Sequence, residues 1–155
     1  VIPASASVIP GEDPGSMSPM SPMSLIVKGA NTTIDLASFV AHNGNPDVAQ
    51  VDLTGTGDNT VKLDLNAVPS MQGTADNLDT PVDESSMLVV NGNAGDTVQL
   101  PAGISWTSVT NGVSGESLSA TYGAGYNFAP GDLYTQLSYG GGTLFIDEAM
   151  TRTNV

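Results

Sequence analysis

Acidic and amide side chains of this sequence gather in short glycine-rich segments, where their oxygens could bind a metal ion. One group lies in and beside residues 52–64, a second lies in 91–96, and a third follows at 147–148. Calcium takes six to eight oxygen ligands from carboxylates, amide and backbone carbonyls and water, and neighbouring glycines let backbone carbonyls turn inward. The sequence therefore predicts a Ca2+ site with these candidate ligands: Asp52, Asp58, Asn59, Asn93, Asp96 and Asp147.

The same residues have a second interpretation that needs no metal. Asp and Asn side chains form turns by accepting hydrogen bonds from nearby backbone N–H groups. The sequence leaves both interpretations open. A comparison of Asp96, which ends a repeated turn, with Asp76, which lies in a polar segment, would separate a specific role from a general effect of charge.

Catalytic chemistry has little support in the sequence. The chain has no cysteine, which excludes disulfides, thiolate zinc sites and cysteine nucleophiles, and its one histidine, His42, lies in a polar segment with no nucleophile suggested beside it. The 16 acidic residues allow many carboxylate pairs, but no spacing selects one. The glycine-rich turns also lack the following lysine and helix of a phosphate-binding loop. We expect no catalytic residues and no enzyme.

The aromatic residues of the second half offer a possible sugar-binding surface. Aromatic rings stack on sugars, so these side chains could bind a glycan partner; packing within the domain is the favoured alternative. The residues concerned are Trp106, Tyr122, Tyr126, Phe128, Tyr134 and Tyr139.

Composition and charge narrow the class of protein. The chain has 155 residues and a formal net charge of −13, so nucleic acid and anionic membrane surfaces would repel it. No run of about 18 apolar residues could insert into a membrane as a helix. Only 12% of residues are charged, and there are 18 glycines and 10 prolines. This composition favours an all-β, extracellular bacterial protein over a helical one.

The expected elements are short strands separated by turn residues from Leu25 onward. We expect one β domain over 25–155, a β-sandwich or short β-roll of antiparallel strands. Single helical turns are expected at 36–41 and 64–71, and a long acidic loop at 72–85. The expected strands are 24–28, 32–36, 47–53, 60–65, 86–90, 96–100, 104–109, 117–122, 133–138 and 142–147.

Residues 1–24 form an extended arm of different composition. The arm holds five of the ten prolines and repeats Val-Ile-Pro and Ser-Pro-Met units, so it could be a solvated linker. Its apolar content favours docking instead, either on the body of the domain or on a neighbouring subunit. We expect a strand at about 4–9 that adds to the sheet edge of another chain. The expected subunit-contact residues are Val1, Ile2, Val8, Ile9, Met17, Met20 and Met23.

An internal repeat links two of the glycine-rich turns. Residues 51–63 (VDLTGTGDNTVKL) align with 88–100 (LVVNGNAGDTVQL) at a shift of 37 residues, and both read as strand, turn and strand. Each turn resembles a degenerate calcium-binding nonapeptide.

Three segments resemble a repeat module of large secreted RTX-type bacterial adhesins, which are calcium-associated surface proteins. These segments are VDLTGTGDNTVKLDLNAV, SSMLVVNGNAGDTVQL and GGGTLFIDEAM, and the resemblance covers about residues 47–149. It implies a β-sandwich-like extracellular module. The segment 101–130 is longer than in such modules, and the arm lies outside the resemblance.

Together these features predict a structural subunit of an extracellular bacterial fibre, biofilm or surface assembly. The arm would link each copy to its neighbour and so produce a homopolymer. The alternative is a monomeric calcium- or glycan-binding adhesin module of a larger secreted protein.

Overall fold

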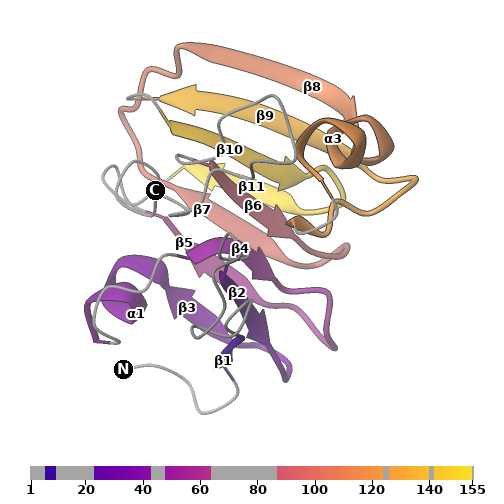
Figure 1. Cartoon of the computed structure of the whole chain (residues 1–155). Helices are drawn as coiled ribbons and strands as arrows, with labels where there is room; N and C mark the ends of the chain where they lie inside the picture. Colours follow the sequence, from indigo (N-terminus) through magenta and orange to yellow (C-terminus); the bar gives the residue numbers. More distant parts are fainter. Residues whose placement is uncertain are drawn as a thin grey trace, which may run out of the picture.

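The computed structural model describes residues 6–9, 23–42, 48–63, 87–123, 126–139 and 142–154, and it is mostly β (Figure 1). One sheet has seven strands in the order β1 (Ala6–Ile9), β2 (Met23–Val27), β4 (Val48–Asp52), β6 (Met87–Asn91), β10 (Gly142–Asp147), β9 (Leu133–Tyr139) and β8 (Ser108–Ser114). The other sheet has four strands in the order β11 (Thr151–Asn154), β7 (Thr97–Leu100), β5 (Thr60–Lys62) and β3 (Thr33–Asp35). The described helices are α1 (Leu36–His42) and α3 (Gly115–Tyr122).

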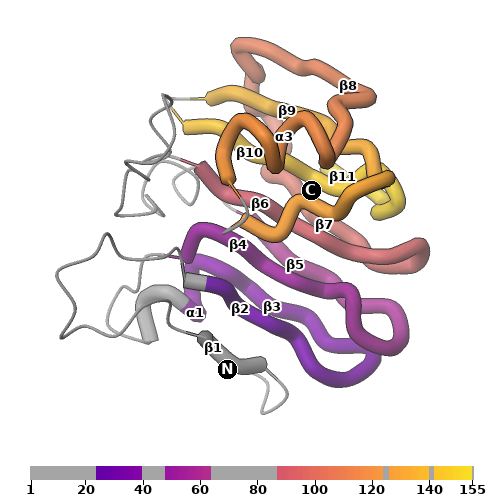
Figure 2. The backbone as a smooth tube through the Cα atoms, turned by 45° about the vertical axis from the view of Figure 1, so that its right-hand side comes forward, coloured from indigo at the N-terminus to yellow at the C-terminus, as the bar shows by residue number. Residues whose placement is uncertain are grey.

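Four strand–turn–strand units, here called coils, form the four-stranded sheet and the middle of the seven-stranded sheet. The coils are β2–β3, β4–β5, β6–β7 and β10–β11, and each contributes one strand to each sheet. Every strand of a coil pairs in parallel with the equivalent strand of the next coil. Figure 2 shows this order along the molecule, from the indigo strands at one end to the orange and yellow strands at the other.

The expectation of antiparallel strands is wrong for the coils. Successive coils follow the same path, so equivalent strands lie side by side and run in the same direction. Among the described strands, antiparallel pairing is confined to the two ends of the seven-stranded sheet, where β1 pairs with β2 and β9 pairs with both β10 and β8. The register reproduces the 37-residue repeat, because Thr60 pairs with Thr97 and Val61 with Val98.

Alternating residues of the coil strands fill two apolar clusters. The larger cluster contains side chains from both sheets, including the fully buried Leu25, Val51 and Val98. Residues on the opposite face of the seven-stranded sheet, such as Val89 and Phe145, pack against α3 and residues 126–134 in a second cluster. Strand β6 is therefore buried on both faces, which explains its continuous apolar run Met-Leu-Val-Val.

Helix α1 confirms the helical turn expected at 36–41. The N–H of Ser38 donates to Asp35 Oδ1 at 3.1 Å, which is the contact that an acidic residue makes at a helix N-terminus. The segments 64–71 and 72–85 lie outside the described residues.

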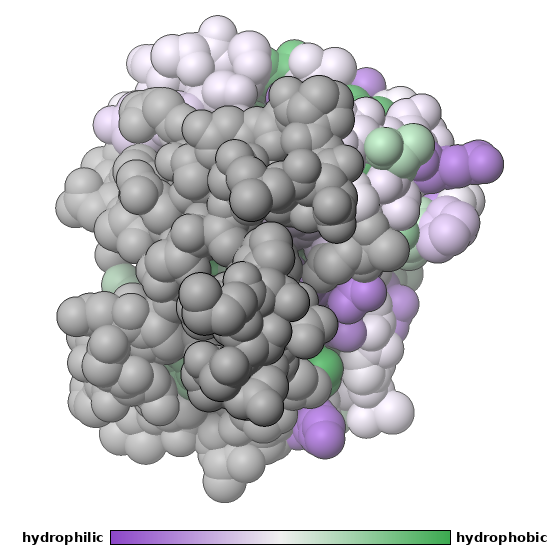
Figure 3. Space-filling model, in the orientation of Figure 1, coloured by the Kyte–Doolittle hydropathy of each residue, from purple (hydrophilic) through white to green (hydrophobic). Residues whose placement is uncertain are grey.

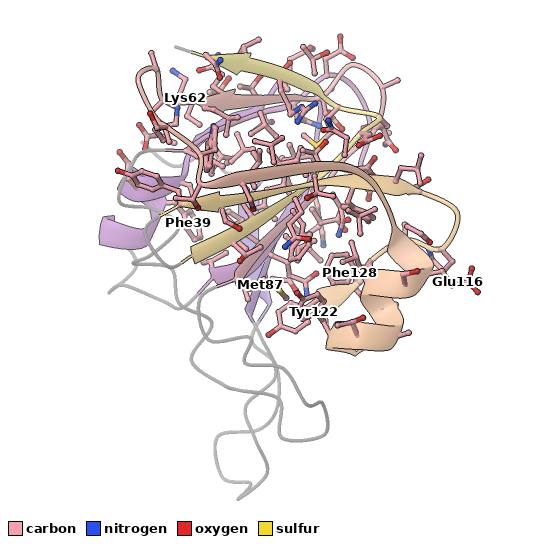
Figure 4. All side chains as sticks on the ribbon, turned by 90° about the horizontal axis from the view of Figure 1, so that it is seen from above. Phe39, Lys62, Met87, Glu116, Tyr122 and Phe128 are labelled. Atoms are coloured by element: carbon pink, nitrogen blue, oxygen red, sulfur yellow. The ribbon has the colours of Figure 1, made fainter. Side chains whose placement is uncertain are left out.

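The strand expected at 117–122 is wrong, because these residues belong to α3. Ser114 caps the helix by accepting a hydrogen bond from the Ser117 N–H, and Gly123 ends it with φ +89°. The strand expected at 104–109 is displaced to β8, and β11 was not expected. Figure 4 shows Tyr122, the last residue of α3, beside Phe128, while Glu116 of the same helix points away from the domain.

The visible surface agrees with the low content of charged residues. Beside the grey atoms, Figure 3 shows mostly pale residues with scattered hydrophobic and hydrophilic side chains. None of the described helices has the length and hydropathy needed to cross a membrane.

Candidate functional site

The predicted ligands Asn59 and Asp96 lie at equivalent positions of successive turns. Together with Thr32 they form the turn ladder, in which the backbone N–H groups of Thr32 and Asn59 each donate to the side chain of the equivalent residue in the next coil. The Thr32 N–H donates to Asn59 Oδ1 at 3.0 Å, and the Asn59 N–H donates to Asp96 Oδ1 at 2.8 Å. The side chains of Asn59 and Asp96 are fully buried. The turn ladder thus ties three coils together through side-chain oxygens.

The remaining polar atoms of these turns also bind backbone. Asp96 Oδ2 accepts from the Asn93 N–H at 2.7 Å, and Asn59 Nδ2 donates to the Gly57 carbonyl at 3.2 Å. Asn93 Nδ2 donates to the Thr54 carbonyl of the preceding coil at 2.9 Å. In the structure these side chains therefore act as turn formers, which is the second of the two interpretations that the sequence left open.

Asp58 is, like Asn93, a predicted ligand with an exposed side chain in these turns. Its carboxylate lies against Gly95 of the next coil, where an added Cβ would collide with Asp58 Oδ1. Gly95 also has φ +104°, which favours glycine. Among the described residues, no group of three or more Asp, Glu, His or Cys side chains is arranged to hold a metal ion. Calcium binding at these turns stays a prediction.

The other two predicted ligands, Asp52 and Asp147, belong to the opposite face of the seven-stranded sheet. Asp52 of β4 pairs with Asn91 of β6. On the other side of β6, Ile146 pairs with Val90, so the next residue, Asp147, follows at the same end of these strands. Asp52 Oδ1 accepts from the Thr54 N–H at 2.8 Å, and Asp147 Oδ1 accepts from the Ala149 N–H at 2.9 Å. The structure therefore separates the six candidates into two groups, four in the turns and two at the strand ends.

A buried polar network beside Asp147 was not found from the sequence. The Tyr134 hydroxyl donates to Asn91 Oδ1 at 2.5 Å and accepts from the Ala129 N–H at 2.9 Å. Asn91 Nδ2 donates to the Asn127 carbonyl, and Asn127 Nδ2 donates to Gln50 Oε1, both at 3.2 Å. This network fastens the segment 126–134 to two coils. Its members are far apart in the sequence and share no repeat, so no local pattern could have indicated it.

Burial raises the pKa values of two side chains in this region, Tyr134 and Asp147. Desolvation is the largest cause that raises the pKa of Tyr134 to about 12, and the nearby carboxylate of Asp147 adds to the effect. Desolvation also raises the pKa of Asp147, which the backbone N–H of Ala149 partly offsets. Both groups therefore favour their neutral forms more than they would in water.

The aromatic side chains pack within the domain. Phe128 lies edge-on to Tyr134 and to Phe145, with ring centroids 5.3 Å apart in each pair. Tyr126 is also buried in this cluster. Trp106 and Tyr139 are partly exposed and form an edge-on pair at 6.1 Å. The glycan partner stays a prediction, and these two rings are the aromatic pair that remains accessible to test it.

Of the arm, the structure describes Ala6–Ile9, Met23 and Ser24. Ala6–Ile9 form β1, within the range expected for a strand, and β1 pairs antiparallel with β2 of the same chain. Val8 pairs with Leu25 and Ile9 with Ser24, whereas Met23 is the first residue of β2. The other arm residues predicted to make subunit contacts lie outside the described residues: Val1, Ile2, Met17 and Met20. The backbone of His42 lies at the end of α1.

Comparison with known proteins gives no relative. Scans against protein-family models, curated proteins and solved structures found no match to this chain.

Proposed function

We propose that this chain is a structural subunit of an extracellular bacterial fibre or surface assembly, in which copies are joined by exchange of strand β1. The finer architecture in this proposal is a short β-roll of four coils. The observation that carries the proposal is the pairing of β1, a separate N-terminal strand, with the edge of the coil strand β2.

The position of β1 suits an exchangeable strand. Four residue pairs join it to β2, and residues 10–22 connect the two strands. A β1 strand supplied by a second copy makes the same four pairs with β2. The pairs lost within one chain are therefore replaced by equivalent pairs between chains, and protein concentration decides which form is populated. Main-chain hydrogen bonds supply affinity in such strand addition, while alternate side chains supply specificity.

The polar side chains of the turns support a structural role. The oxygens of Asn59 and Asp96 accept hydrogen bonds from backbone N–H groups of their own and neighbouring coils. This use of polar groups stabilises stacked coils. The resemblance to RTX-type adhesin modules and the acidic composition favour the cell surface as the location.

Strand exchange can be tested by disulfide trapping, because the natural chain has no cysteine. Ser7 and Ile26 are paired residues, so a chain with Ser7→Cys and Ile26→Cys locks β1 onto its own β2 when oxidised. We expect the unmodified chain to form multimers as concentration rises, the locked chain to stay monomeric, and reduction to restore assembly. Sedimentation velocity and electron microscopy measure this.

Mixing the two single-cysteine chains is the direct test. A Ser7→Cys chain and an Ile26→Cys chain should form a mixed disulfide dimer, since exchange brings β1 of one beside β2 of the other. Each single variant alone is the matched control. If the double variant oxidises within one chain but the mixture gives no mixed dimer above the controls, β1 does not exchange and the proposal is wrong. A chain that stays monomeric at millimolar concentration also overturns it.

The second candidate is a calcium-binding adhesin module, which the exposed Asp58 carboxylate beside the turn ladder favours. Calcium that binds only the folded chain with a Kd of about 10⁻⁴ M would stabilise it by about 1.4 kcal/mol at 1 mM. The melting temperature should then rise with calcium and fall back in the Asp58→Ala variant. If calcium and sodium at the same ionic strength raise the melting temperature equally, screening of the net charge explains the effect and the calcium site is refuted.

A further inference from the structure

Strand β11 forms one edge of the four-stranded sheet. It pairs in parallel with β7 on one side, from Thr151 with Thr97 to Asn154 with Leu100. The edge of a sheet presents backbone N–H and carbonyl groups that can pair with a strand of another molecule. In a stack of coils, this edge is also the place where a further coil would continue the sheet.

One position of β11 departs from the pattern of the coils. Ile34, Val61 and Val98 occupy equivalent places in β3, β5 and β7, and all three are buried in the large apolar cluster. The residue that pairs with Val98 in β11 is Arg152. Paired residues of adjacent strands lie on the same face of a sheet, so Arg152 stands on the core-facing side. It is exposed because β11 is the edge strand.

Arg152 makes this edge unsuitable for a further strand. A strand added to β11 would cover the end of the apolar cluster and would take the guanidinium out of water. Arginine stays charged in proteins, and burying a charge without a partner costs several kcal/mol. Natural sheets use inward-pointing charged residues at their edges to prevent pairing between molecules. The chain has three basic residues in all, and one of them occupies this position.

The last strand of the seven-stranded sheet shows an interruption at the same end of the molecule. The register of β8 against β9 shifts between Thr110 and Val113. Within this irregularity Gly112 has φ +70°, and its N–H donates to Glu148 Oε1 at 2.6 Å. A bulge bends an edge strand and disrupts continued pairing. Both sheets therefore end with features that oppose the addition of another strand.

We infer that Arg152 closes the β11 edge against a second copy of this chain, so that copies do not stack coil upon coil through the four-stranded sheet. This inference does not depend on exchange of β1. It assigns to Arg152 the role that capping units have in repeat proteins, which is to end a stack of similar units with a polar residue.

The test replaces Arg152 by valine, which continues the aliphatic ladder. The matched control is Lys62→Val, because Lys62 is exposed on the central strand β5 and its loss changes the net charge by the same amount. Both changes are made in the full chain, in the unlocked form and with β1 locked by oxidised Ser7→Cys and Ile26→Cys. Sedimentation velocity over a hundredfold range of concentration then reports association that does not involve β1.

We expect locked Arg152→Val to associate at least about tenfold more tightly than the locked parent and than locked Lys62→Val. Arg152→Glu keeps a charge at the core-facing position and should stay unassociated. Equal sedimentation of Arg152→Val and Lys62→Val would overturn the inference, and so would association of Arg152→Glu as strong as that of Arg152→Val. Arg152→Thr, which is uncharged and suits a strand, provides the same comparison if the valine variant does not fold.

Discussion

The turn ladder gives a quantitative prediction for Asp96. Its carboxylate is fully buried and accepts two backbone hydrogen bonds, from the Asn59 N–H at 2.8 Å and from the Asn93 N–H at 2.7 Å. Asp96→Ala removes both acceptors and leaves the buried Asn59 N–H without the partner that links it to the next coil. The change therefore breaks the tie between two coils and the closure of one turn.

The magnitude follows from the number and kind of hydrogen bonds. A hydrogen bond to a charged group contributes about 1.5–3 kcal/mol, so the loss of two should lower the free energy of unfolding by about 3–6 kcal/mol. Asp96→Asn keeps one acceptor but turns an amide N–H toward the second donor, and it should lose about half as much. Native domains are stable by about 5–15 kcal/mol, so both changes are measurable in a folded protein.

Urea unfolding followed by the fluorescence of Trp106 measures these differences, because Trp106 is the one tryptophan of the chain and packs against the large cluster. The control is Asp58→Ala, which removes the same charge from an exposed side chain in the neighbouring turn. We expect this control to stay within about 0.5 kcal/mol of the natural chain. If Asp96→Ala and Asp58→Ala differ by less than 1 kcal/mol, the turn ladder does not stabilise the coils as argued.

Three further changes test how residues 115–149 are held against the coils. Tyr134→Phe removes the hydroxyl that binds Asn91 and the Ala129 N–H, which should cost about 1–3 kcal/mol in urea unfolding at pH 7. Burial raises the Tyr134 pKa from 10.0 to about 12, so the folded chain retains a proton that the unfolded chain loses, and the free energy of unfolding falls between pH 10 and 12 by up to about 3 kcal/mol. The Tyr134→Phe chain should lack the part of this decrease that is due to Tyr134. If the free energy of unfolding falls equally with pH in both chains, the argument about the Tyr134 pKa is wrong. Desolvation raises the Asp147 pKa above its ordinary 3.8, so its stabilising contribution is present below that pH and is lost as pH rises through the folded-state pKa. As pH rises through this pKa, Asp147→Asn should become more stable relative to the natural chain. A difference in the free energy of unfolding that stays constant from pH 3 to 7 would refute the raised pKa of Asp147. Gly115→Ala should lower stability by about 2 kcal/mol, although alanine favours helices, because the new Cβ collides with the Ala129 carbonyl; unchanged unfolding would show that this backbone moves aside.

The internal repeat is the part of the fold that the sequence predicts best. Equivalent residues of successive coils stack, so the 37-residue shift between Asn59 and Asp96 becomes a direct hydrogen bond in the structure. The same shift places Thr60 beside Thr97. The sequence could therefore predict that these turn side chains lie close together. It could not predict what their oxygens bind, because the same oxygens suit either a cation or a backbone N–H.

Strand direction and the segment 101–123 are the parts that sequence reasoning missed, whereas the strand expected at 133–138 is confirmed as β9. Alternation of apolar and polar residues shows which face of a strand is buried, but it does not show which strand lies beside it. The segment 117–122, expected to be a strand, belongs to α3. The Ser114 cap and Gly123 bound a helix there, and these end signals were present in the sequence. The contact of Tyr134 with Asn91 joins residues without any repeat, so only the folded chain brings them together.

The two ends of the stack have different consequences for assembly. At one end, the edge of β2 is covered by β1, a strand that belongs to no coil and is joined to β2 by residues 10–22. At the other end, Arg152 and the bulge of β8 oppose further pairing.

Under the proposed exchange, each copy both donates and accepts a strand at the same end. Reciprocal exchange between two copies closes a dimer, whereas donation to a third copy continues a chain. Residues 10–22 decide between these outcomes because they set the span between donor and acceptor.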